Sequence, residues 1–146
     1  MRIIIIIEDP LMEDIEVKIL CKQKTSYVDC LASAISKEQI TINGKIENEY
    51  TRIFSDDIYY FEAVDNKTYI YCEKEVYQSD MKLYELEIKL LGTKFTRINK
   101  SCIMNIAKLE KVKGQINGRL LATLSNREKL IINRSYVQEI KRILGI

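Results

Sequence analysis

The stretch FTRINKSCIMN, residues 95–105, places a polar triplet between two short runs of strand-forming residues. Phe95 to Ile98 and Cys102 to Ile106 have the length and the β-branched or aromatic content that strands favour. The triplet between them, Asn99-Lys100-Ser101, consists of residues that commonly form tight turns. The stretch therefore predicts two short strands joined by a loop that presents an amide, a cation and a hydroxyl.

The same alternation of short strand and turn continues on both sides of this stretch. Turn signals such as Asp65-Asn66, Asn117-Gly118 and Ser125-Asn126 separate runs that are rich in Tyr, Ile and Val. We expect further strands at Ile46 to Phe54, Ile58 to Val64, Thr68 to Cys72, Leu109 to Lys113, Arg119 to Leu124 and Lys129 to Ile132. This spacing predicts a mainly β fold of sandwich type with small helices.

Two helices are expected within this β pattern. Asp80 to Leu91 has leucines at helical spacing on one face and is followed by Gly92, a typical helix stop. Ser135 to Leu144 begins with Ser135-x-x-Gln138, the pattern of a capping box. Two interpretations of the Ser135 hydroxyl stay open: it caps the helix, or it donates to an external phosphate.

Residues 1–44 have the pattern of a small β-β-α-β extension. The expected elements are strands at Arg2 to Ile7, Ile15 to Cys21 and Ile40 to Ile42, with a helix that begins near Ser26. Asn43-Gly44 predicts a type I′ hairpin turn at the end of this segment. Five consecutive isoleucines are too apolar to lie exposed, so we expect a central strand or a subunit seam. The extension could act as a dimer seam, as a docking face for an inhibitor, or as a lid on the core.

The charge is divided unevenly along the chain. Residues 1–92 hold 11 basic and 18 acidic side chains, whereas residues 93–146 hold 12 basic and 3 acidic ones. The C-terminal segment therefore has a net charge of +9, which predicts a polyanionic partner, because neutralised phosphates release condensed counterions.

Catalytic and metal chemistry find little support in the composition. The chain has no His, and its cysteines, Cys21, Cys30, Cys72 and Cys102, lack paired metal-ligand spacing. Without His no nucleophilic triad can form, and none of the glycine-rich phosphate-binding patterns occurs. We therefore expect no enzyme activity, no cofactor, no metal and buried cysteines. Because no secretory signal is recognisable, we also expect a cytoplasmic protein.

Three triplets combine an amide, a base and a hydroxyl beside a predicted strand: Asn66-Lys67-Thr68, Asn99-Lys100-Ser101 and Asn133-Arg134-Ser135. Asn can pair with an adenine edge, Lys and Arg can reach guanine or phosphate, and Ser or Thr can donate to a phosphate oxygen. The same residue types are also ordinary turn formers, which explains any one triplet well. All three together favour DNA binding.

Three blocks resemble the LytTR-type DNA-binding domain of bacterial transcription regulators. They are Ile58 to Val64, Phe95 to Asn105 and Leu130 to Val137, and the resemblance covers about residues 45–146. It implies a stack of small β-sheets that reads double-stranded DNA with loops in successive major grooves, as a homodimer on repeated half-sites. It also divides the chain into an extension, residues 1–44, and a DNA-binding domain, residues 45–146.

Carried over by position, the resemblance implies a set of DNA-contacting residues in three loops and one adjoining strand. Arg97 and Ser101 would hold phosphates, and the others would read bases or support that reading. The predicted residues are Asn66, Lys67, Arg97, Asn99, Lys100, Ser101, Arg134 and Ser135.

The extension is too short for a phospho-accepting receiver domain, so the chain resembles the short stand-alone regulators of the family. Such regulators are often paired with a small membrane protein that holds them inactive, which the resemblance implies as a further partner. The alternative function is a β-rich interaction module that binds an acidic protein or membrane surface through the basic C-terminal half. Its contact patch would comprise Tyr59, Tyr60, Phe61 and Tyr69.

Overall fold

The computed structural model describes residues 5–13, 15–36 and 40–146, which fall into two units, Met1–Glu38 and Gln39–Ile146. In the described part of the first unit, helix α1 (Ser26–Ser36) is the sole regular element. None of the described helices is long and apolar enough to cross a membrane.

The two strands predicted near the N-terminus are not found. Residues 15–21 form no strand, and neither do residues 5–7, while residues 2–4 lie outside the described residues. The side chains of Ile5, Ile6 and Ile7 are more than three-quarters exposed. An apolar run becomes a strand only when a neighbouring strand satisfies its backbone, and the sheets of the described residues include neither segment.

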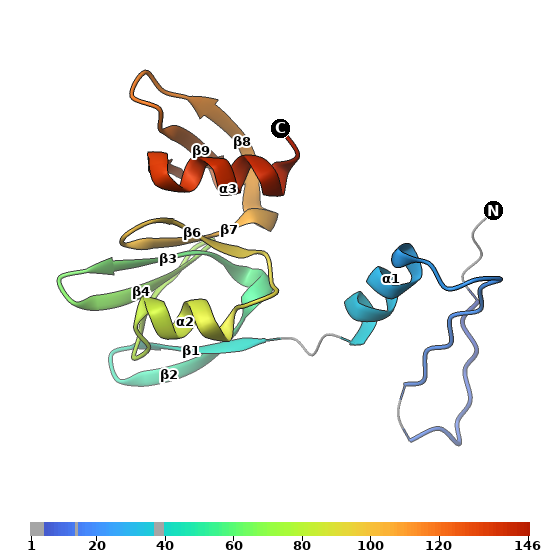
Figure 1. Ribbon diagram of the computed structural model, residues 1–146. Helices are drawn as coiled ribbons and strands as arrows, with labels where there is room; N and C mark the ends of the chain where they lie inside the picture. Colours follow the sequence, from blue (N-terminus) through green and yellow to red (C-terminus); the bar gives the residue numbers. More distant parts are fainter. Residues whose placement is uncertain (1–4, 14, 37–39) are drawn as a thin grey trace. The chain divides into compact units, whose positions relative to one another are not determined.

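The second unit contains a seven-stranded antiparallel sheet with the order β2-β1-β5-β4-β3-β7-β6 (Figure 1). It confirms the mainly β fold. Its strands are β1 (Thr41–Ile46), β2 (Glu49–Phe54), β3 (Ile58–Val64), β4 (Lys67–Cys72), β5 (Val76–Ser79), β6 (Phe95–Asn99) and β7 (Cys102–Asn105). Strand β5 was not predicted, because its four residues include Gln and Ser and show little strand pattern.

The predicted turn at Asn43-Gly44 is wrong, because both residues lie inside β1. The chain turns at Glu47 and Asn48 instead, which adopt left-handed φ values of 50° and 66°. Gly44 serves a packing purpose: a Cβ atom there would lie 2.6 Å from Tyr77 Cβ. Because the turn lies at Glu47 and Asn48, the segment Ile46 to Phe54, which was predicted as a single strand, is divided between β1 and β2.

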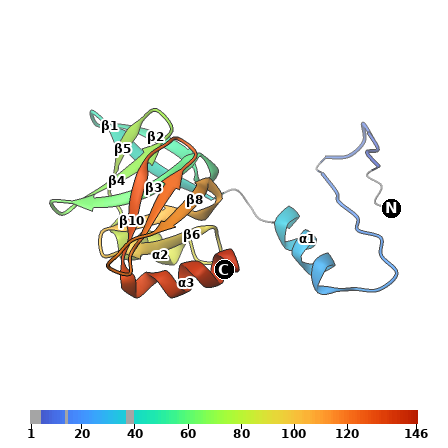
Figure 2. The ribbon, with the colours of Figure 1, turned by 90° about the horizontal axis from the view of Figure 1, so that it is seen from above.

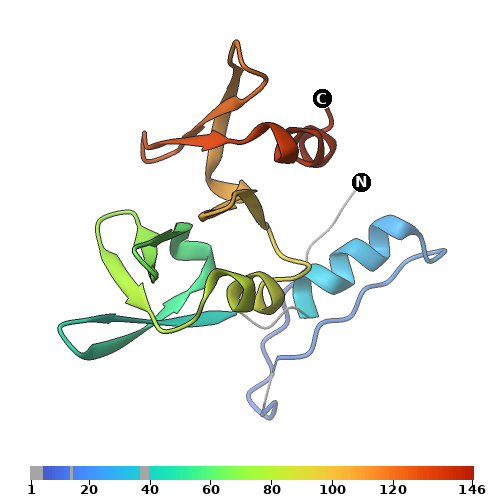
Figure 3. The ribbon, with the colours of Figure 1, turned by 60° about the vertical axis from the view of Figure 1, so that its left-hand side comes forward.

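A three-stranded antiparallel sheet of order β10-β9-β8 forms a second layer, shown in orange to red in Figure 3. Its strands are β8 (Leu109–Gly114), β9 (Leu120–Leu124) and β10 (Lys129–Ile132). Helix α3 (Arg134–Leu144) follows β10 directly, and two short 3-10 helices occupy Ser55–Asp57 and Ile106–Lys108.

Helix α2 (Leu83–Lys89) is shorter than the predicted Asp80 to Leu91. Asp80 is held outside the helix, since its carboxylate accepts a hydrogen bond of 2.6 Å from the Tyr50 hydroxyl and lies 2.9 Å from Lys45 Nζ. These two partners lower the pKa of Asp80. The helix begins after Lys82, whose backbone N–H donates to Glu85 Oε1 at 3.2 Å.

Two apolar clusters stabilise this unit. One joins the two sheets and α3, and its buried members include Tyr60, Met104, Leu124, Ile132 and Ile140. The other lies between the seven-stranded sheet and α2. Tyr59, Tyr60 and Phe61 are buried and Tyr69 is half-buried, so the aromatic contact patch of the alternative function does not exist.

All four cysteines were predicted to be buried, and this holds fully for Cys102 and in part for Cys72. Burial raises the pKa of the Cys102 thiol to about 12 and that of the half-buried Cys72 thiol to about 11. Cys21 and Cys30 are exposed, because they lie in the first unit rather than in the β core.

Candidate nucleic-acid interface

The first predicted loop is the turn between β3 and β4. Asp65 and Asn66 have left-handed φ values of 50° and 64°, as a two-residue type I′ turn requires. The Asn66 carbonyl accepts a hydrogen bond of 2.9 Å from Lys82 Nζ, which ties the turn to the residue before α2. The side chains of Asn66 and Lys67 are exposed on the outside of this turn.

The second loop joins β6 to β7 and is organised by Asn99. The side-chain oxygen of Asn99 accepts hydrogen bonds from the Ser101 N–H at 2.9 Å and the Ser101 hydroxyl at 3.0 Å. Its side-chain nitrogen donates to the Ile131 carbonyl at 3.1 Å. Lys100 lies between the two polar residues with its side chain exposed. Asn99 and Ser101 thus shape the loop, and Lys100 extends from it.

Arg97 also bonds within the chain. One guanidinium nitrogen donates to the Lys100 carbonyl at 2.9 Å, and the other lies 3.0 Å from Glu87 Oε2 on α2. The side chain is only 18% exposed. Arg97 therefore clamps the second loop to α2, and a phosphate contact would use the remaining donors of the guanidinium.

The third loop is the junction between β10 and α3. The helix begins at Arg134 with Asn133 as its N-cap, so Ser135 is its second residue and the predicted Ser135-x-x-Gln138 capping box does not form. No hydrogen bond of the Ser135 hydroxyl to another described residue is found, and the side chain is exposed. Of the two interpretations of this hydroxyl, capping of the helix is wrong.

Backbone hydrogen bonds bring the three loops together. The Ala63 N–H donates to the Ser101 carbonyl at 2.8 Å, which links β3 to the second loop. The Asn133 N–H donates to the Ile98 carbonyl at 2.9 Å, which links the second loop to the third. In Figures 1 and 2 the β3–β4 turn, the β6–β7 turn and the start of α3 all lie toward the left-hand side. We call this side of the unit the loop edge.

The turn between β8 and β9 adds residues to the loop edge that the sequence prediction missed. A Cβ atom on Gly118 would lie 3.2 Å from Arg134 Cδ, so the Arg134 side chain lies against this turn. Arg119 and Ile116 are exposed in the turn, and Ile116 is fully exposed. The Asn117-Gly118 signal located the turn, but its proximity to Arg134 depends on the packing of the second sheet.

The loop edge has the chemistry of a polyanion-binding surface. Lys67, Lys100, Arg119 and Arg134 supply exposed cations, and Asn66 supplies an exposed amide. Such side chains bind phosphate oxygens and base edges. Because the loops belong to strands of a packed core, their spacing is fixed before any partner binds.

A mainly β unit with a rigid edge of basic and amide-bearing loops is typical of a nucleic-acid-binding module. The sequence model of the family named LytTr DNA-binding domain matches residues 48–145 of this chain. The chain belongs to this family, which is a class of DNA-binding regulatory domains involved in transcription regulation.

Known bacterial relatives agree with this membership. The sensory transduction protein LytT of Enterococcus faecalis is 31% identical over 109 residues, which cover 75% of this chain and 44% of that protein. The transcriptional regulatory protein YpdB of Escherichia coli K12 is 26% identical over 126 residues, which cover 86% of this chain and 51% of that protein. The chain thus spans about half the length of these curated relatives.

A solved structure shares the fold. It is described as the LytTr DNA-binding domain of a Bacillus cereus protein, and it superposes with a TM-score of 0.70 at 23% identity. The match covers 75% of this chain and all of that chain.

Proposed function

We propose that this chain is a sequence-specific regulator of transcription that reads the major groove of double-stranded DNA with the loop edge. The observation that carries the proposal is the set of backbone and side-chain hydrogen bonds that hold the second loop to β3 and to β10. Three polar loops held in fixed register suit a repetitive, rigid ligand such as a duplex.

The loops would divide the task between base reading and positioning. Lys100 and Arg134 are exposed and free to reach guanine edges, and Asn66 and Lys67 flank them on the first loop. Ser135 would donate to a phosphate, together with the donors that Arg97 and Ser101 have left. Asn99 would read a base only by exchanging its bonds to Ser101 and Ile131.

We further propose that the protein acts in the cytoplasm as a homodimer on repeated half-sites, without catalytic activity. Residues 1–44, of which residues 41–44 belong to β1, are the proposed dimerisation or docking segment, and an inhibitory membrane protein is one candidate for the docked partner. An exposed apolar stripe on α1, formed by Tyr27, Leu31 and Ile35, supports a contact role for this segment.

The test is genome-wide immunoprecipitation of bound DNA, comparing the wild type with a Lys100→Ala/Arg134→Ala variant. We expect sharp peaks over a repeated motif that the variant loses. On that motif in vitro, each single substitution should cost about 1 to 3 kcal/mol of binding free energy, with much less on unrelated DNA. On the motif each truncation removes a base contact, whereas on unrelated DNA it removes only a weak attraction to phosphate.

The matched control is Lys74→Ala/Lys89→Ala, which removes two exposed lysines from the β4–β5 connection and α2. It should retain the peaks. Peaks that are absent from the wild type, or retained in the Lys100/Arg134 variant, would contradict the proposal and favour the interaction module.

A further inference from the structure

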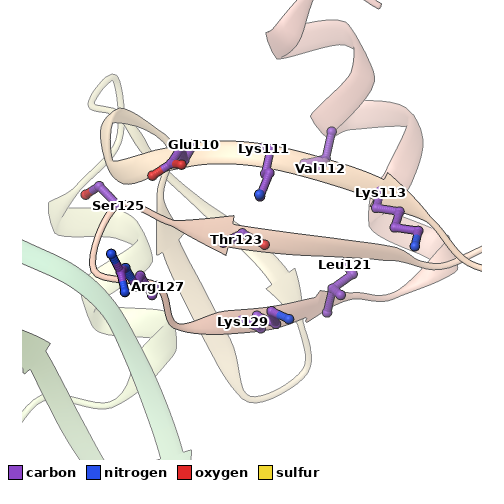
Figure 4. A pocket seen from close by; sticks show the side chains of 9 residues that line it. All are labelled: Glu110, Lys111, Val112, Lys113, Leu121, Thr123, Ser125, Arg127 and Lys129. Carbon is purple, nitrogen blue, oxygen red and sulfur yellow. The ribbon is translucent and has the colours of Figure 1, made fainter.

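The outer face of the three-stranded sheet carries a group of cations separate from the predicted loops. In the strand register, Lys111 and Lys129 both flank Thr123, and Lys113 flanks Leu121. Residues paired across strands point to the same side of a sheet, and Figure 4 shows these side chains on one face. Arg127, from the β9–β10 turn, lies at the margin of the same shallow depression. We call Lys111, Lys113, Arg127 and Lys129 the sheet-face cations.

These cations are not neutralised by the protein. Elsewhere in residues 93–146, all of which are described, Arg97 and Arg142 pair with carboxylates and Lys108 lies 5.0 Å from the centre of the Tyr59 ring. No ion pair within the described chain involves the sheet-face cations. Glu110 is the one acidic residue that lines the depression. The face therefore keeps most of its positive potential for an external anion.

The composition of the face favours phosphate over a protein surface. Protein interfaces are enriched in aromatic residues and depleted in Lys, whereas this depression is lined by three lysines and no aromatic residue. Thr123 adds a hydroxyl of the kind that commonly donates to phosphate oxygens, whereas the Ser125 hydroxyl donates to the Tyr59 hydroxyl at 3.4 Å. A phosphodiester backbone offers a negative charge to the lysines and acceptor oxygens to the hydroxyl.

The face also adjoins the loop edge. Strand β10 begins at Lys129 and leads to Asn133 and Arg134 in the third loop, a distance of roughly 13 Å at strand spacing. This is well within one helical turn of duplex DNA, about 34 Å.

We propose that the sheet-face cations form a second DNA contact, which holds the phosphate backbone of the duplex flanking the sequence read by the loop edge. The inference rests on the proposed function. It adds a surface that does not read bases, and it requires the flanking duplex to bend toward the three-stranded sheet. Sheet-face contacts then contribute affinity that depends on the length of the flank rather than on its sequence.

The experiment uses the full chain and two duplexes built on the motif that the wild type selects from a random pool. The short duplex ends at the motif, and the long duplex continues for about ten base pairs, roughly one helical turn, on each side. The test variant replaces all four sheet-face cations with Gln. The control variant replaces four exposed lysines outside the sheet-face cations with Gln, so that both variants have the same net charge. These lysines are Lys74, Lys89, Lys94 and Lys141.

We expect the test variant to lose about tenfold in affinity for the long duplex relative to the control variant, with less than about twofold difference on the short one. Its salt dependence on the long duplex should flatten by roughly three in log–log slope, because up to four phosphate contacts are lost. Equal affinities of the test and control variants on both duplexes would overturn the inference. This is also the result expected if the face binds an acidic protein instead of DNA. A wild type that selects no duplex would overturn the proposed function together with it.

Discussion

Asn99 illustrates at the residue scale how one side chain can serve both fold and function. Its oxygen accepts two hydrogen bonds from Ser101 while its nitrogen donates to the Ile131 carbonyl, so it joins the second loop to β10. Arg97 is engaged in the same way by Glu87 and the Lys100 carbonyl. The triplet pattern predicted which functional groups lie at the loop edge. It could not predict which of them are already bonded, because the partners are distant in sequence.

Asn99→Ala should lower the free energy of unfolding by about 1 to 3 kcal/mol, since it leaves the Ile131 carbonyl and the Ser101 N–H without their partner. Lys100→Ala, one residue away and exposed, should change it by less than about 0.5 kcal/mol. Urea denaturation of both variants measures the difference. Equal stabilities would show that Asn99 does not organise the second loop.

At the element scale, strands were predicted well where they pair within the core and poorly where partners or turns decide. Strands β3, β4, β9 and β10 lie close to their predicted positions because their apolar runs face two buried clusters. The hairpin turn was predicted at Asn43-Gly44, but the chain turns at Glu47-Asn48. Turn propensity favours Asn-Gly, but the close approach of Tyr77 to β1 requires the glycine inside the strand.

Gly44→Ala should therefore destabilise the protein by about 1 to 3 kcal/mol, because the new Cβ would lie 2.6 Å from Tyr77 Cβ and 2.7 Å from Ile53 Cδ1. Gly114 in β8 provides the control, since a Cβ there meets nothing within 4 Å. Gly114→Ala should be neutral or slightly stabilising. Thermal unfolding of the two variants compares them, and a neutral Gly44→Ala would refute the packing role.

Helix α3 positions Arg134, and a single buried side chain anchors it. Ile140 is fully buried against the cluster that joins the two sheets, whereas Ile143 is 40% exposed. Ile140→Ala should cost about 2 to 5 kcal/mol of stability through lost burial and a cavity. Ile143→Ala should cost clearly less. Guanidinium denaturation distinguishes them, and similar losses would mean that α3 is held by other contacts.

At the scale of the whole molecule, seven of the twelve basic side chains of residues 93–146 lie on two surfaces. Lys100, Arg119 and Arg134 lie at the loop edge, and the sheet-face cations lie on the outer face of the second sheet. The +9 charge predicted a polyanionic partner but not this division, which depends on strand register. Electrostatic capture by both surfaces followed by loop insertion is the mechanism that we propose.

The most direct test of major-groove reading is dimethyl sulfate footprinting of the wild type on its selected motif. The reagent methylates guanine N7 in the major groove and adenine N3 in the minor groove, so it reports which groove is covered. We predict protection of guanine N7 in successive major-groove segments, and loss of part of that protection in Lys100→Ala and Arg134→Ala. Protection confined to adenine N3, or unchanged reactivity of guanine N7 in a bound complex, would contradict the account.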